Sequence, residues 1–149
     1  MVKRGCIIMY KSHRKNQSSD TQNDMVRIQS ACEQINADVA KLKTALLAVF
    51  DMEPDSSVFS SITSIEKEVE HIAGLIRSVT GINTIGLACS RILSRLQTIK
   101  TELANTLDVD EYRHIRTGVY AIDASVQYIE ICLIRMMKTP ALATAPAYH

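Results

Sequence analysis

The sequence contains no tryptophan and few residues that interrupt helices. Aromatic residues make up 5% of its 149 residues, and there are 5 glycines and 3 prolines. Because Gly and Pro are the residues least compatible with a helix interior, their scarcity is typical of an α-helical protein. Charged residues at 22% and hydrophobic residues at 46% are ordinary for a globular chain. The composition predicts an all-α protein that is large enough to bury a core of its own.

Long apolar runs are also missing. No run approaches the roughly 18 residues of a membrane span, so we expect no transmembrane segment. The apolar part of "MVKRGCIIMYKSHRK" is about five residues, whereas a signal peptide needs at least about seven. The four cysteines form neither a C-x-x-C pair nor a dense disulfide framework. We therefore expect an intracellular, reducing location, either cytoplasmic or nuclear.

Motifs for nucleotide binding and for hydrolysis are absent. There is no G-x-x-x-x-G-K-[ST] and no G-x-S-x-G, and "GINTIG" has no strand before it. We expect no enzymatic activity and no cofactor.

Four segments have apolar residues at alternating steps of three and four. They cover about 24–52, 57–80, 84–107 and 109–137, and the first contains "MVRIQSACEQINADVAKLKTALLAVF". Asp24 is placed to cap the first segment, and Asp108 with Glu111 forms a capping-box pattern before the last. Such heptad spacing predicts helices packed at shallow angles. The rows predicted to form the core are Met25, Ile28, Cys32, Ile35, Val39, Leu42, Leu46 and Val49; Val58, Ile62, Ile65, Val69, Ile72, Ile76 and Val79; Ile85, Cys89, Ile92, Leu96, Ile99 and Leu103; and Tyr112, Ile115, Val119, Ile122, Val126, Ile129, Leu133 and Met136.

The short connections favour an up-down-up-down four-helix bundle over residues 24–138. Residues 1–23 are expected to form a basic, flexible arm, and residues 139–149 a flexible Pro/Ala tail. The alternative is an extended coiled coil in which the second and third segments continue through "TGINTIG" as one helix.

Two E-x-x-H motifs raise the possibility of a di-metal site. Glu68 and His71 lie on the second segment, and Glu111 and His114 on the fourth. Di-iron bundles use this pair with all ligands pointing inward. Here the heptad frame places both glutamates at flanking positions and both histidines toward solvent. We therefore predict no metal site.

The cysteines of the helical segments have a simpler interpretation. Cys32 and Cys89 fall in core positions and Cys132 beside the core, all toward the same end of the bundle. No histidine shares their level on an inward face. Because Cys is often buried as a small hydrophobic residue, we expect reduced, inert thiols.

The N-terminal arm carries most of the positive charge. Residues 1–20 have a net charge of +4 and residues 21–149 a net charge of −3. The cations are Lys3, Arg4, Lys11, Arg14 and Lys15. Such a cluster suits nucleic-acid phosphates, with nuclear import and membrane anchoring through Cys6 as alternatives.

The last segment has a second apolar stripe outside its core row. Tyr120, Ala124, Tyr128, Ile131 and Ile134 follow one another at steps of 4, 4, 3 and 3. A helix that is apolar on every side is normally covered on every side, which a single four-helix bundle does not provide. The stripe predicts a protein partner or self-association through Tyr120, Tyr128, Ile131 and Ile134.

These features favour a non-enzymatic helical interaction protein, an oligomerising adaptor or scaffold. The alternative is a nucleic-acid or nucleoprotein accessory factor, in which the bundle multimerises basic arms. That layout resembles the multimerisation modules of viral phosphoproteins, in architecture alone.

Overall fold

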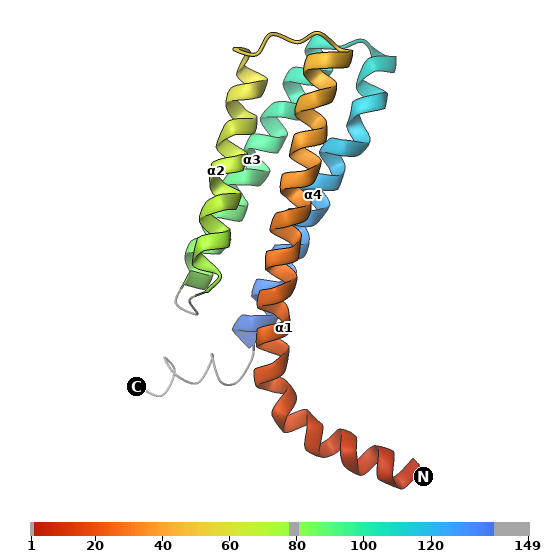
Figure 1. Cartoon of the computed structure of the whole chain (residues 1–149), viewed down its shortest axis with the longest axis vertical. Coiled ribbons are helices and arrows are strands. Elements are labelled where there is room, and N and C mark those ends of the chain that lie inside the picture. Colours follow the sequence, from red (N-terminus) through yellow and green to blue (C-terminus); the bar gives the residue numbers. More distant parts are fainter. Residues whose placement is uncertain (1, 78–80, 139–149) are drawn as a thin grey trace.

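The computed structural model describes residues 2–77 and 81–138, with side chains described from residue 21 onward. Its elements are helix α1 (Val2–Thr44), a π-helical turn η1 (Ala45–Val49), and helices α2 (Ser57–Leu75), α3 (Ile82–Thr106) and α4 (Val109–Lys138). No strand occurs within these ranges. Figure 1 shows the four helices side by side, each running opposite to the one before it, with the N-terminal part of α1 extending beyond the others. The predicted all-α helical bundle is confirmed.

Every pair of neighbouring helices is joined by an ion pair, which defines their order around the bundle. Three of the four pairs lie at least partly on the surface, where such pairs add little stability but do record which residues face each other. The pairs are Lys43–Glu66 (3.3 Å, α1 to α2), Arg91–Glu68 (2.9 Å, α2 to α3), Lys100–Asp123 (2.6 Å, α3 to α4) and Arg135–Asp24 (2.9 Å, α4 to α1). The helices therefore form a closed ring in chain order.

The core consists almost entirely of the predicted apolar rows. From Ile28 on α1 to Leu46 in η1, and from Ile115 to Met136 on α4, each predicted core residue is buried. The predicted core residues Met25 and Tyr112 are only partly buried against this core. Val49 departs further, because 71% of its surface is exposed. It ends the π-helical turn, whose backbone hydrogen bond from Phe50 N to Ala45 O spans five residues. This wider turn changes the helical period and rotates Val49 away from the core, so its predicted core position was wrong. Val79 lies outside the described residues.

The first helix begins much earlier than predicted. Its start at Asp24 was wrong, since α1 begins at Val2. Residues 2–23 contain no proline and only Gly5, so nothing interrupts the helix before Asp24. Asp24 is therefore not an N-cap. The division of the chain into arm and bundle stays a prediction, and the tail of residues 139–149 lies outside the described ranges.

The second and third predicted helices are separate. α2 ends at Leu75, earlier than the predicted Thr80, and α3 starts at Ile82, so the alternative of one continuous helix was wrong. Gly81 allows the chain to reverse closely here. A Cβ atom at this position would lie 3.1 Å from Leu75 O and 3.2 Å from Leu75 Cβ. A side chain here would therefore need Leu75 to move by a few tenths of an ångström, which favours glycine at this position.

The predicted capping box of α4 is confirmed. Glu111 N donates to Asp108 Oδ1 at 2.8 Å, and Asp108 N donates to Glu111 Oε1 at 3.0 Å. These bonds satisfy N–H groups that have no partner within the helix. They fix where α4 begins, and hence which of its residues face outward.

Candidate functional site

The second apolar stripe of α4 is exposed in the structure. Tyr128 and the two isoleucines Ile131 and Ile134 are 39%, 51% and 50% exposed, and Met137 in the last turn is 53% exposed. These residues alternate with the buried row Val126, Ile129, Leu133 and Met136. The C-terminal half of α4 therefore presents apolar residues to solvent as well as to the core, beside the exposed polar residues Gln127, Arg135 and Lys138. We call Tyr128, Ile131, Ile134 and Met137 the outer patch. Met137 is not among the interface residues predicted from the sequence.

Tyr120, the fourth predicted interface residue, is engaged within its own chain. The Lys100 ammonium lies 4.7 Å from the centre of the Tyr120 ring. The same ammonium donates to Asp123 Oδ2 at 2.6 Å. Although Tyr120 is 49% exposed, its ring packs beside this α3–α4 ion pair. It stands two turns from Tyr128 and is not part of the outer patch.

Shallow grooves flank the outer patch on both sides. One, of about 440 Å³, lies between α1 and α4, and Val26, Ala31 and Tyr128 contribute to its walls. The other, of about 330 Å³, lies between α3 and α4 and includes Ile134 and Met137. Val26 is 61% exposed and extends the apolar surface onto α1. The sequence pattern of α1 gave no reason to connect Val26 with α4.

A polar cluster lies beside the outer patch. Asp24 is 3% exposed and accepts hydrogen bonds at Oδ1 from Arg27 Nη1 and Arg135 Nη2, both at 2.9 Å. Arg135 also donates to Cys132 Sγ at 3.3 Å. The buried carboxylate is thus satisfied by two cations, as a buried charge must be. This cluster joins the end of α4 to α1.

The cysteines predicted to be buried thiols are buried and free. Cys32, Cys89 and Cys132 are each at most 2% exposed. Burial raises the pKa of Cys89 to about 12, with Glu130 and Cys32 adding to the effect, and burial with Glu33 raises that of Cys32 to about 11. Burial also raises the pKa of Cys132, although its hydrogen bond from Arg135 opposes this. Thiols so far from ionisation are poor nucleophiles.

The E-x-x-H residues do not converge. Glu68 accepts two hydrogen bonds from Arg91, at 2.9 and 3.0 Å, and Glu111 caps α4. Both His71 and His114 are exposed. Among the side chains described, no group of three or more His, Cys, Asp or Glu is arranged to hold a metal ion.

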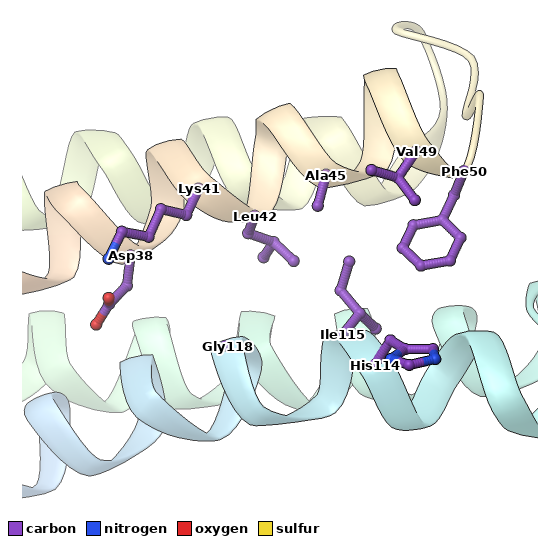
Figure 2. Close-up of a pocket in the computed structure, with 9 residues that line it drawn as sticks. All are labelled: Asp38, Lys41, Leu42, Ala45, Val49, Phe50, His114, Ile115 and Gly118. Atoms are coloured by element: carbon purple, nitrogen blue, oxygen red, sulfur yellow. The ribbon is translucent and has the colours of Figure 1, made fainter.

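A pocket of about 490 Å³ lies between α1 and α4, at the end of the bundle where α4 begins. Figure 2 shows Leu42 and Ala45 of α1 and η1 facing Ile115 of α4 across it. The rings of Phe50 and His114 lie at one end, and Asp38 and Lys41 lie at the other. The pocket was not predicted from the sequence.

Two small residues open this pocket. Ala45 and Gly118 lie on the facing sides of the two helices and leave unfilled the space that larger side chains would occupy. A Cβ atom added at Gly118 would have no heavy atom within 4 Å. The π-helical turn then places Phe50, which is half-buried, at the end of the cavity.

The predicted nucleic-acid contacts lie on the extension of α1. Positions Lys3, Arg4, Lys11, Arg14 and Lys15 all fall within the helix that begins at Val2. Figure 1 shows that this part of α1 continues beyond the bundle and curves away from the direction of the rest of the helix.

Comparison with known proteins adds no relative. No protein-family model, no curated protein and no solved structure matches the chain. None of the helices described is long and apolar enough to cross a membrane. The described part of the chain is a four-helix bundle with exposed apolar residues on α4 and a pocket between α1 and α4.

Proposed function

We propose that the chain is a non-enzymatic interaction protein, an adaptor or scaffold that binds a partner helix through the outer patch of α4. The observation that carries this proposal is the exposure of Tyr128, Ile131, Ile134 and Met137 along one half of one helix. Scattered exposed apolar residues are normal, whereas several consecutive ones on the outer face of a helix indicate a contact surface. The grooves on either side offer places for the side chains of a second helix.

Self-association is the first form of this proposal to test. A second copy of the chain supplies a helix that is apolar on its outer face, and two such faces bury each other. Contacts of this kind are the basis of helix-in-groove recognition and of symmetric dimers. The proposal places the protein inside the cell, in the cytoplasm or the nucleus.

The test compares serine substitutions of exposed apolar residues at the two ends of the bundle. Ile131→Ser together with Ile134→Ser removes the centre of the outer patch without touching a buried residue. Leu47→Ser, at the opposite end of the bundle and 41% exposed, is the matched control. Light scattering should show association weakened at least tenfold by the double substitution and unchanged by the control. Equal association of the double variant and the wild type would refute the proposal.

A second candidate function is nucleic-acid binding by the N-terminal part of α1. At about 100° per residue, positions 3, 4, 11, 14 and 15 fall within an arc of about 120° of the helix. A single helix that begins at Val2 thus gathers five basic positions on one face. A row of basic residues binds nucleic-acid phosphates through electrostatic attraction, without reading the base sequence.

The experiment for this second function is a salt titration of binding to single-stranded RNA. Lys11→Glu, Arg14→Glu and Lys15→Glu together should lower the affinity at least tenfold and reduce its dependence on salt. Lys67→Glu, Arg95→Glu and Arg116→Glu, on the exposed surface of the bundle, make the same change of charge as a control. Equal losses in both variants would show that only net charge matters, and the function would be rejected.

A further inference from the structure

We propose that the pocket between α1 and α4 binds a small, uncharged, mainly apolar molecule. This inference is independent of the outer patch, because the pocket lies where α4 begins and the patch where α4 ends. Its volume of about 490 Å³ falls within the range of ligand sites, roughly 300 to 1,000 Å³. At roughly 30 Å³ per non-hydrogen atom, it holds a molecule of about 16 such atoms.

The lining of the pocket favours an apolar ligand. Leu42, Ala45 and Ile115 form its floor between the two helices, and Phe50 closes one end (Figure 2). Val49 stands at its edge with 71% of its surface exposed. A bound apolar molecule would cover that exposed surface and the face of the Phe50 ring. Burying apolar surface of this kind stabilises a complex by about 25 cal/mol per Å² before the costs of association.

The charged groups at the rim favour a ligand without charge. Asp38 and Lys41 contribute one carboxylate and one ammonium at the same end of the pocket, so that their charges oppose each other. Asp38 also accepts a hydrogen bond from Gln34 Nε2 at 3.2 Å. The polar side chains at the rim, Asp38, Lys41 and His114, are not buried. The pocket therefore contains no desolvated charge that would attract an ion of opposite sign. These groups can still bind one hydroxyl of a ligand at the rim.

Gly118 gives the pocket a specific means of being closed. A Cβ atom added at this position would have no heavy atom within 4 Å, and Gly118 lines the pocket, so a larger side chain has open space beside the cavity. Gly118→Leu should therefore fill the pocket and leave the bundle folded. Gly74→Leu is the matched control, because Gly74 lies on α2, has equally open surroundings and lines no part of this pocket. Ala45→Leu fills the same space from the opposite helix and replaces Gly118→Leu should that variant fail to fold.

The probe for the experiment is N-phenyl-1-naphthylamine, an uncharged fluorescent molecule of suitable size. Its fluorescence should rise on binding the full chain with one site per protein. Gly118→Leu or Ala45→Leu should weaken binding at least tenfold, with Gly74→Leu unchanged. Decanol should displace the probe at lower concentration than decanoate or decylammonium.

Three results would overturn the inference. One is equal binding of the probe by the wild type and by the filled-pocket variants. Another is loss of binding in the Ile131→Ser and Ile134→Ser variant, which would show that the probe binds the outer patch instead of the pocket. The third is stronger displacement by a charged competitor than by decanol, which would show that the rim selects an ion.

Discussion

Arg135 Nη2 donates a hydrogen bond to Asp24 Oδ1 at 2.9 Å and so connects the end of α4 to α1 across 111 residues of sequence. Asp24 is buried, whereas Arg135 is about half exposed, so the two partners depend on the pair unequally. Among the side chains described, Arg27 is the other cation paired with this carboxylate. The pair also lies next to the outer patch, whose Ile134 precedes Arg135.

Removing the charge of Asp24 should destabilise the bundle. Asp24→Asn weakens two charge-assisted hydrogen bonds at a buried atom, and we expect a loss of about 1 to 3 kcal/mol in the free energy of unfolding. Urea denaturation followed by circular dichroism measures it. Asp110→Asn, in the exposed pair with Arg113, is the control and should have a much smaller effect, limited to the first turn of α4. Equal stability of Asp24→Asn and the wild type would contradict the buried position of Asp24.

The effect of a glycine-to-alanine substitution on stability should depend on its position. Gly81→Ala brings a Cβ atom to 3.1 Å from the Leu75 carbonyl oxygen, so Leu75 would have to move by a few tenths of an ångström. We expect a loss of about 1 to 3 kcal/mol, as for other overpacked sites. Gly74→Ala and Gly86→Ala meet nothing within 4 Å and should gain about 0.5 to 1 kcal/mol from better helix propensity. Thermal unfolding of the three variants tests this, and a stabilising Gly81→Ala would contradict the close turn.

The buried thiols should make stability depend on alkaline pH. The pKa values of Cys32 and Cys89 rise from 9.0 to about 11 and about 12 in the folded protein. In the unfolded chain the thiols lose their protons first, so their contribution is complete below about pH 9 and falls as the pH rises toward 11 and 12. The expected slope is on the order of 1 kcal/mol per pH unit for each thiol.

The measurement is urea unfolding between pH 7 and pH 11 on the wild type and on Cys32→Ala with Cys89→Ala. All other side chains are the same in both proteins, so their contribution cancels in the comparison. The double variant should start less stable at pH 7 and lose less between pH 9 and pH 11. Parallel curves would show that the thiols are not buried as described.

Tyr120 should affect stability and leave association unchanged. Tyr120→Leu removes the ring beside the Lys100 ammonium and should cost about 0.5 to 1 kcal/mol, whereas Tyr120→Phe keeps the ring and should be near neutral. Urea denaturation measures the first effect and light scattering the second. Weaker association of Tyr120→Leu would show that Tyr120 belongs to the interface and would contradict this prediction.

The core could be predicted from the sequence because helical burial repeats with a fixed period. Ile28, Ile92 and Ile122 are fully buried as their spacing indicates. Val49 departs from that period because a π-helical turn ends its segment, and the sequence carries no strong signal for such a turn. Asp24 is a residue type that often caps helices, but here it pairs with Arg27 on its own helix and with Arg135 on the last helix.

The candidate sites were predictable to different degrees. The exposed apolar residues of α4 follow from one helix and its period, so Tyr128, Ile131 and Ile134 could be named in advance. The pocket depends on Ala45 and Gly118 facing each other on two helices. Their facing positions become visible only once the two helices are docked. The Lys100 ammonium beside Tyr120 belongs to α3, so this contact also could not be predicted from the sequence.

The most direct test of the central claim is the molar mass of the full wild-type chain, measured by light scattering at two concentrations tenfold apart. Without an added partner, an outer patch that binds a second copy predicts a mass above the 16.6 kDa of one chain that increases with concentration. A mass of 16.6 kDa at both concentrations would contradict self-association through α4.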